Sequence, residues 1–443
     1  MRSAVTCSTR TAVRRCCRHV TQRGQQRCEA HRSWAEQIPA AGACRSSSFL
    51  ADAVRDSVKE ALTSRSINHI INGEASKPAS LVDVPTLQSC DDFVYDIDLE
   101  RQPSGKFAAA LEARLPDPFR LVASDMKTLS DGCKELLGTD HPVLQSAAQY
   151  FFDVDGGKKV RPVMVLLMSR ACNASCAPPP APFALACQRR LAEITEMIHT
   201  ASLFHDDVID KADTRRGAPS ANRAFGNKLA ILAGDFLLAR ASVSLSRLRS
   251  VETVELLSTV IEHLVKGEVL QMRPHVDGAG TRAFEYYVHK TYYKTGSLMA
   301  NSCQAAALLG GSPAAVQRDA HEYGKRVGLA FQLIDDVLDF EGSDASLGKP
   351  ALNDLKEGLA TAPVLLAAEE HPALLDMVAR KFGRDGDAAA AHELVLRSDG
   401  IARARDLAIV QAELAMDAAT RLAPSEERDA LVALAARVVD RRR

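Results

Sequence analysis

One acidic pattern occurs twice in the chain, at residues 206–210 and 335–339. Both segments read Asp-Asp-apolar-apolar-Asp, and they begin 129 residues apart. On a helix the first and fifth side chains project from nearly one face, one turn apart. Burying several unpaired carboxylates costs several kcal/mol for each. A cation is the usual compensation, and carboxylate ligands favour a hard ion such as Mg²⁺, which also contacts substrate phosphates.

The alternative is that both segments are solvent-exposed helix faces, where Asp is common. Their surroundings argue against it, because they lie in the apolar runs 194–209 and 327–340, which have a helical period. These runs place the aspartates at the edge of a buried core.

Groups that bind anions cluster around these motifs. Lys158 and Arg161 lie three residues apart at an expected Gly-bearing helix start, and an ammonium and a guanidinium suit phosphate oxygens. His199 lies two helical turns before the first motif, although a lone His there is more often a structural hydrogen-bonding group. The other candidates follow the motifs or lie between them: Arg215, Arg216, Lys290, Lys294, Thr295, Lys349 and Lys356. The pattern predicts a site for Mg²⁺-bound diphosphates.

The elements that must position these residues are predicted to be helices. From residue 105 onward apolar residues recur at three- and four-residue spacing, and strand-like alternation is nearly absent. We expect one all-α domain over 105–443, an antiparallel helical bundle around a central cavity, preceded by a linker over 51–104. The Pro-rich segment 173–190 is expected to loop out, and we assign it no role.

Composition excludes several function classes. Hydrophobic residues make up 46% and charged residues 25%, as in an ordinary soluble globular chain. The net charge of −1 gives no global field that would attract nucleic acid. No run approaches the uninterrupted apolar stretch of a membrane-spanning helix.

Residues 1–50 differ from the rest, with nine Arg, no Lys and two acids. This composition is typical of an organelle transit peptide, mitochondrial rather than plastid, and the alternative is a disordered basic tail.

In this order the motifs resemble the trans-isoprenyl diphosphate synthases, specifically the long-chain solanesyl- or decaprenyl-type polyprenyl diphosphate synthases of quinone biosynthesis. The resemblance covers residues 105–443. It is carried by residues 156–162, 196–210, 214–217, 233–238 and 331–336, by the pairs Gly267-Glu268 and Lys294-Thr295, and by Gly348-Lys349 with Asp354. One acidic motif alone would be weak evidence. Two of them, with the Gly-Lys-x-x-Arg-Pro and Arg-Arg-Gly blocks in order, are strong.

The resemblance implies roles for the motif residues and an all-α isoprenoid synthase fold. About three Mg²⁺ would be bound by Asp206, Asp210, Asp335 and Asp339. The allylic diphosphate would be bound by Arg215, Lys294 and Lys349. Isopentenyl diphosphate would be held by Lys158, Arg161, His199 and Arg216. The groups near the carbocation would be oriented or stabilised by Thr295 and Gln332.

The implied activity is sequential condensation of isopentenyl diphosphate onto farnesyl or geranylgeranyl diphosphate. The allylic diphosphate ionises, the double bond of isopentenyl diphosphate attacks, and a proton is lost to the departing diphosphate. Ala201 and Ser202, about one turn before Asp206, are small where short-chain members carry a floor of bulky aromatics. We therefore expect a long product, unless another helix supplies the stop through Leu237, Leu238 or residues on the segment before Lys294.

Other interpretations stay open. A metal phosphohydrolase using His205 with Asp206 leaves the second motif unexplained, and a class I terpene cyclase would carry a different second metal motif. A non-catalytic or partner-dependent subunit of a heteromeric synthase is the stronger alternative, although both acidic motifs are intact. The resemblance suggests a homodimer, with a heteromer and peripheral membrane contact during product release left open.

Two departures matter. Residues 358–363 read Gly-Leu-Ala-Thr-Ala-Pro where many relatives have Gly-Lys-x-Thr, so no role passes to a Lys there. We interpret this as a feature of the long-chain subtype. The basic end, Arg441, Arg442 and Arg443, either shields the diphosphate site or is a solvated end.

Overall fold

The computed structural model describes residues 97–138, 142–153, 159–174, 176, 178–215, 217–272, 281–341 and 353–441. All of them belong to one compact unit, Thr86–Arg443. Its elements in chain order are α5 (Lys106–Glu112), α6 (Pro118–Leu121), α7 (Ala123–Leu137), α8 (Pro142–Asp153), α9 (Val160–Asn173), α10 (Pro182–Ile209), β1 (Thr214–Arg215), β2 (Ala218–Pro219), α11 (Ala221–Phe225), α12 (Asn227–Arg247), α13 (Val251–Met272), α14 (Thr281–Thr291), η2 (Tyr292–Gly296), α15 (Ser297–Leu309), α16 (Ala314–Glu341), α18 (Asn353–Lys356), α19 (Ala362–Glu370), α20 (Ala373–Ala379), α21 (Asp387–Leu396), α22 (Gly400–Thr420) and α23 (Glu426–Val439). The all-α prediction is confirmed, because the strands among these residues are the short pair β1 and β2 alone.

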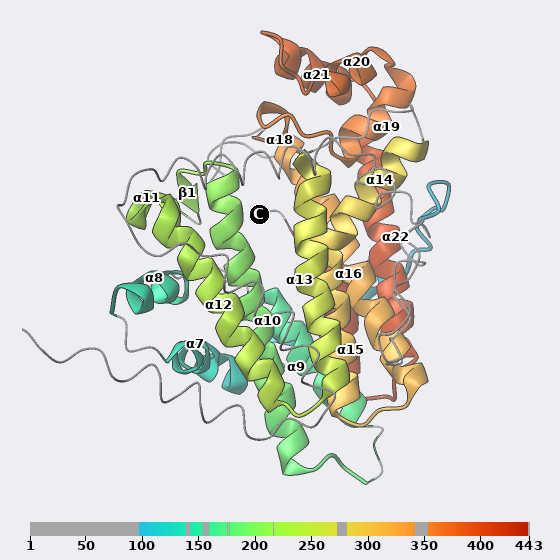
Figure 1. Ribbon diagram of the computed structural model, residues 1–443. Coiled ribbons are helices and arrows are strands. Elements are labelled where there is room, and N and C mark those ends of the chain that lie inside the picture. The colour runs from blue at the N-terminus through green and yellow to red at the C-terminus, as the bar shows by residue number, and fades with distance from the viewer. Residues whose placement is uncertain are drawn as a thin grey trace, which may run out of the picture. The chain divides into compact units, whose positions relative to one another are not determined.

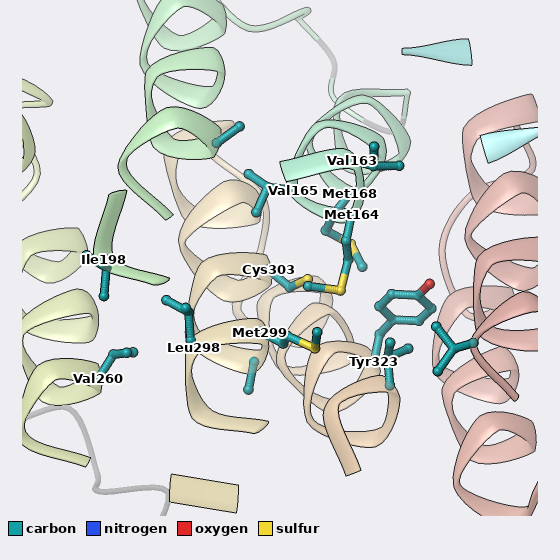
Figure 2. Packing of buried hydrophobic residues seen from close by; sticks show 14 of the residues in the cluster. Val163, Met164, Val165, Met168, Ile198, Val260, Leu298, Met299, Cys303 and Tyr323 are labelled. Carbon is teal, nitrogen blue, oxygen red and sulfur yellow. The ribbon is translucent and has the colours of Figure 1, made fainter. Parts of the chain in front are cut away.

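The middle of the bundle is built from α9, α10, α15 and α16, which share one buried apolar core (Figure 1). α16 packs along α15 and α22, and α10 packs along α9 and α12. Figure 2 shows Met164 and Met168 of α9 packed beside Cys303 of α15 and Tyr323 of α16. The Tyr323 hydroxyl donates to the carbonyl oxygen of Leu431 on α23 at 2.8 Å, so this buried polar group is satisfied.

Two glycines set the distance between α16 and the helix beside it. A Cβ on Gly324 would lie 2.4 Å from the carbonyl oxygen of Met299, and one on Gly328 would lie 2.7 Å from the Cα of Gly296. Any side chain at either position would therefore push the two backbones apart. This close approach matters to the site, because α16 carries the second acidic motif and η2, which ends at Gly296, carries predicted site residues.

A π-helical turn, η2, interrupts the helix formed by α14 and α15. Such turns bond residue i to residue i+5, are rare, and occur often at functional sites. α13 supports this turn closely. A Cβ on Gly267 would lie 2.7 Å from Lys294 Cγ, and the rings of His263 and Tyr293 stack with centroids 4.5 Å apart.

Each acidic motif lies towards the C-terminal end of a 28-residue helix. α10 ends at Ile209, so Asp210 is its C-cap, whereas α16 contains the whole second motif. The hairpin of β1 and β2 follows α10, and Gly217 in its turn has a φ of 78°, which favours glycine.

The expectation that residues 173–190 loop out is wrong for the second half of this segment. Residues 182–190 form the first turns of α10, where Cys187 and Gln188 are buried. Gln188 Nε2 donates to the carbonyl oxygen of Ala306 at 2.8 Å. Because Pro182 stands in the first helical turn, where a missing N–H costs nothing, the Pro-rich composition marks the start of a helix.

The chain already contacts the bundle before residue 105. Ile97 and Leu99 pack against the core, and the backbone N–H and hydroxyl of Ser104 donate to Glu413 at 2.6 and 2.9 Å. The boundaries 1–50, 51–104 and 105–443 stay predictions, since residues 1–96 lie outside the described part.

Within the described part, α12 is the one helix whose length and composition would allow it to cross a membrane. It packs along α10 and α13, and Arg240 Nε donates to the carbonyl oxygen of Leu136 at 2.7 Å. Only 39% of the apolar stretch of this helix is buried, and Ile231, Leu232 and Val243 are exposed. α12 therefore presents an apolar face on the surface of the bundle.

Candidate active site

The first acidic motif divides into accessible and buried carboxylates. Asp206 is half-buried and Asp210 is exposed beyond the last turn of α10, whereas Asp207 is completely buried. One Asp207 oxygen accepts from Nε and Nη2 of Arg215, at 2.9 and 2.5 Å. The second residue of the motif therefore ties β1 to α10, while the first and fifth remain accessible.

The pKa values of both accessible carboxylates are raised. For Asp206 burial is the main cause, and the positive charge of Lys294 opposes it. The pKa of Asp210 is raised to about 6, chiefly by burial, and the carboxylates of Glu268 and Glu357 add to the rise. Asp210 is exposed, yet the protein around it displaces part of the water that would hydrate its charge.

In the second motif, Asp335 and Asp339 occupy the corresponding positions on α16. Arg441 Nη2 lies 2.8 Å from an Asp335 oxygen, and the Asp335 side chain remains 41% exposed. Burial nevertheless raises the pKa of Asp335 to about 6. Asp339 accepts from the backbone N–H of Asp354 at 3.4 Å. The pKa of Asp354 is raised to about 8, first by burial and then by the charges of Asp336 and Asp339.

η2 supplies a lysine that interacts with the first motif. Lys294 Nζ lies 2.5 Å from Glu268 Oε2 and 3.0 Å from Gln271 Oε1, both on α13. Its positive charge partly offsets the rise in the pKa values of Asp206 and Asp210 that burial causes. Lys294 is therefore held beside the end of α10 by a carboxylate and an amide.

Neighbours of Lys294 along the chain connect to the second motif. Burial lowers the pKa of Lys290, and the charges of Asp336 and Asp354 oppose that fall. Thr295 Oγ1 donates to Gln332 Oε1 at 3.1 Å, and Gln332 Nε2 donates to Asp336 Oδ1 at 2.9 Å. The residues predicted to act near the carbocation, Thr295 and Gln332, are thus in direct contact.

Two residues predicted to bind isopentenyl diphosphate meet between α9 and α10. Arg161 Nη1 and His199 Nε2 lie 3.1 Å apart. The Arg161 guanidinium lies 5.9 Å from the centre of the Phe331 ring, and its charge partly offsets the rise in the pKa of Asp335. Arg441 covers the same ring at 3.8 Å, with its side chain only 10% exposed. The basic end was expected either to shield the diphosphate site or to be solvated. Arg441 contacts the candidate site and is not solvated.

Not every predicted site residue can be placed. Lys158, Arg216 and Lys349 lie outside the described residues, as do Arg442 and Arg443. The residues predicted to set chain length lie on α10: Ala201 is completely buried, and Ser202 is partly buried, with its hydroxyl donating to the carbonyl oxygen of His199 at 2.9 Å.

Sequence reasoning did not assign several groups that the structure brings to the site, namely Glu268, Gln271, Tyr287 and Asp354. Glu268 and Asp354 stand in stretches that carry the family resemblance, so a signal was present. Gln271 and Tyr287 meet their partners across 23 and 49 residues, and no local pattern indicates such contacts.

The acidic residues fit divalent cations. The raised pKa values of Asp206, Asp210 and Asp335 show incompletely compensated carboxylates, which a bound cation would stabilise. Among the described residues, no three His, Cys, Asp or Glu side chains form a ready-made metal site. Mg²⁺ is usually held by one or two carboxylates together with water and substrate phosphates, so accessible pairs suit it once a diphosphate is present.

Several known proteins are similar to this chain in sequence and in fold. A family model described as polyprenyl synthetase matches residues 141–395. The chain is 48% identical over 367 residues to the probable hexaprenyl pyrophosphate synthase, mitochondrial, of Neurospora crassa, covering 73% of this chain and 82% of the relative. It is 46% identical over 324 residues to solanesyl-diphosphate synthase 1, mitochondrial, of Oryza sativa subsp. japonica, covering 71% and 75%. The crystal structure of a polyprenyl synthase from Caulobacter crescentus CB15, complexed with calcium and isoprenyl diphosphate, is similar with a TM-score of 0.65 at 30% identity, covering 77% and 99%.

Replacing Asp354 with Asn should change the pH dependence of the unfolding free energy of the metal-free protein. Because its folded pKa of about 8 lies above the ordinary 3.8, the folded state holds more protons between these values. This contribution is fully present below about pH 4 and is lost as the pH rises towards 8. Asp354→Asn should match the original protein near pH 4 and be more stable at pH 8.

Urea unfolding in EDTA at a series of pH values measures this effect. The slope of unfolding free energy against pH should become shallower by up to about 1.4 kcal/mol per pH unit. Asp131→Asn, at an exposed position on α7, is the control and should leave the slope unchanged. Equal slopes for Asp354→Asn and the original chain would contradict the assignment.

Proposed function

The chain belongs to the polyprenyl synthetase family, and from this premise we propose that it condenses isopentenyl diphosphate repeatedly with an allylic diphosphate, farnesyl or geranylgeranyl. The product is a long all-trans polyprenyl diphosphate, the precursor of the side chain of ubiquinone or plastoquinone. One observation carries the proposal: η2 supplies Lys294 beside the first acidic motif and joins the second through Thr295 and Gln332. The hexaprenyl and solanesyl synthases among the relatives support it.

Metal binding is proposed at the accessible carboxylates. About three Mg²⁺ would be held by Asp206, Asp210, Asp335 and Asp339. Held there, Mg²⁺ would neutralise negative charge on diphosphate oxygens and so would favour departure of the diphosphate. The calcium-bound relative supports the use of a divalent cation.

The two diphosphates would occupy separate cationic positions. The allylic diphosphate would contact Arg215, Lys294 and Lys349. Asp207 already fixes the Arg215 fork, and Lys294 would exchange part of its ion pair with Glu268 for diphosphate oxygens. Isopentenyl diphosphate would be held by Lys158, Arg161, His199 and Arg216. The contact of Arg161 with His199 supports this second position.

In the reaction the allylic carbon–oxygen bond breaks, and the double bond of isopentenyl diphosphate supplies the electrons of the new carbon–carbon bond. A proton then leaves to the departed diphosphate. Lys294 and Arg215 oppose the negative charge that develops on the leaving group, while Thr295 and Gln332 place polar atoms near the carbocation. Buried apolar side chains of α9, α10 and α15 exclude water that would capture the cation.

Removing a carboxylate from either motif should abolish turnover while the fold survives. Asp206→Ala and Asp335→Ala should each lower kcat/KM by more than about a hundredfold, because preorganised charge stabilisation is lost. The assay supplies Mg²⁺, labelled isopentenyl diphosphate and farnesyl diphosphate, and circular dichroism checks the fold. Glu369→Ala, at a surface ion pair on α19, should retain activity. Full activity in either aspartate variant would overturn the metal assignment.

The same assay tests the alternative, a non-catalytic or partner-dependent subunit of a heteromeric synthase. The intact acidic motifs favour catalysis by this chain. If the purified chain forms no product alone but does so in organelle extract, the alternative is supported.

A long product is supported by the small side chains that precede the first motif. Ser202→Phe should shorten the products while condensation continues, because a ring at this partly buried position would obstruct the growing chain. Ala201→Phe should act in the same direction, but overpacking a completely buried position costs about 1–3 kcal/mol. Chromatography of the dephosphorylated products measures their length, with Ser202→Ala as the control. An unchanged product range in Ser202→Phe would place the floor elsewhere, as at Leu237 or Leu238.

We further propose a homodimer formed through the contacting helices α12 and α13. Leu232 on α12 and Val265 and Val269 on α13 are exposed, and exposed apolar patches mark protein interfaces. Leu232→Glu combined with Val269→Glu should halve the mass measured by light scattering. Phe183→Glu, equally exposed but at the start of α10, should not change it. An unchanged mass in the double variant would contradict this interface.

For localisation we propose the mitochondrion, with the plastid as the alternative. The Arg-rich, acid-poor composition of residues 1–50 supports import into an organelle. The Neurospora and rice relatives, both named as mitochondrial, favour the first destination.

A further inference from the structure

Three side chains form a directed hydrogen-bond relay that ends next to Lys294. The Thr295 hydroxyl donates to Gln332 Oε1 at 3.1 Å, and Gln332 Nε2 donates to Asp336 Oδ1 at 2.9 Å. Thr295 is 8% exposed and Asp336 is 1% exposed, so water competes little for these groups. Gln332 and Asp336 stand four residues apart on α16, where side chains of one helix face meet.

The chemistry of Asp336 determines the direction of this relay. An ionised carboxylate can only accept hydrogen bonds. The Tyr287 hydroxyl and the backbone N–H of Ala362 both donate to its other oxygen, at 2.7 and 3.3 Å. Three protein groups thus donate to this one carboxylate, an arrangement that suits its acceptor-only, ionised form. Oδ1 is left as the acceptor for Gln332.

The direction then passes along the chain of groups. Because the amide nitrogen of Gln332 faces Asp336, its carbonyl oxygen faces Thr295. A hydroxyl has one hydrogen and two lone pairs, and Thr295 uses its hydrogen on Gln332. Only lone pairs therefore remain for any further neighbour of the Thr295 hydroxyl.

We propose that Asp336 is a positioning residue that fixes this direction, so that Thr295 turns lone pairs towards the developing allylic carbocation. The inference rests on the proposed function, because only a cation-forming reaction gains from it. A fixed oxygen dipole stabilises positive charge without reorganisation during the reaction. If the relay were reversed, Thr295 would point its hydrogen at the cation and would oppose the reaction.

This role separates Asp336 from its neighbours in the motif. Asp335 is 41% exposed and remains reachable, whereas both oxygens of Asp336 already accept hydrogen bonds from the protein. Asp336 acts through Gln332 and Thr295 and does not itself touch substrate. Its loss should therefore affect the chemical step and not the binding of Mg²⁺.

The test is Asp336→Asn, which keeps the shape but adds a donor that allows the Gln332 amide to turn round. We expect kcat to fall about tenfold or more, with KM for both diphosphates and half-saturation by Mg²⁺ within about twofold. Tyr323→Phe is the matched control. It removes a buried hydroxyl from the same helix, α16, but that hydroxyl bonds to the carbonyl oxygen of Leu431 and lies outside the relay, so kcat should stay within about twofold. A loss of kcat in Tyr323→Phe equal to that in Asp336→Asn would indicate a merely structural role and overturn the inference.

Coupling to Thr295 supplies the stricter test. In Thr295→Val the relay has no hydroxyl to orient, so adding Asp336→Asn should lower kcat no further. Multiplicative losses would overturn the inference. If Asp336→Asn does not fold, Gln332→Leu interrupts the relay while Asp336 keeps Tyr287 and Ala362. It should show the same loss in kcat and the same absence of a further loss in Thr295→Val.

These outcomes distinguish the inference from the function on which it rests. If the original chain is active and Asp336→Asn has an unchanged kcat, the relay is overturned but the proposed function stands. An original chain that forms no prenyl product overturns both.

Discussion

The burial of several neighbouring carboxylates, which lose hydration and also repel one another, is the constraint on which the rest of the site depends. Asp206 and Asp210 at the end of α10, Asp335 on α16 and Asp354 on α18 all have raised pKa values. Such clusters oppose folding unless counter-charges or a bound cation compensate them, and they occur often at functional sites. The nearby cationic side chains compensate this charge only in part, and the remaining negative potential favours a divalent cation with its diphosphate.

In both acidic motifs the second aspartate is buried and accepts hydrogen bonds from other parts of the protein. The repeated sequence alone does not indicate this structural role. Asp207 holds Arg215 and the hairpin behind it, and Asp336 gathers donors from α14, α16 and α19. The glycine contacts of α16 hold it close to η2 and α15, which keeps Gln332 and Asp336 beside Thr295.

Much of this arrangement follows from local sequence patterns. Helical periodicity predicted the long helices that end in the acidic motifs, and spacing placed His199 on the same helix as Asp206. The pairing of Thr295 with Gln332 was implied by the family resemblance, and the two side chains are hydrogen bonded. The assigned roles in binding and catalysis stay predictions.

The remaining features could not be predicted, because they depend on long-range packing. The contact of Arg441 with Asp335 joins residues 106 positions apart, and a basic end is equally compatible with a solvated tail. The loop expected over residues 173–190 failed because proline is acceptable at a helix start. The π-helical turn could not be predicted because α15, which follows it, is buried on nearly all sides, so its rotation leaves no visible shift in an apolar–polar pattern.

That turn has a consequence for how the chain tolerates change in length. An α-helix advances about 100° per residue, so one residue added in a π turn rotates every later side chain by about that angle. α14 and α15 are continuous through η2; α14 buries one face, which carries Phe284, Tyr287 and Val288, whereas α15 is buried on nearly all sides. Losing one residue from 292–296 would restore the ordinary helical period, and α14 would have to turn its buried face towards solvent if α15 kept its packing. The segment 292–296 is therefore intolerant of deletion, whereas a substitution that keeps its length preserves the orientation of α14 relative to α15.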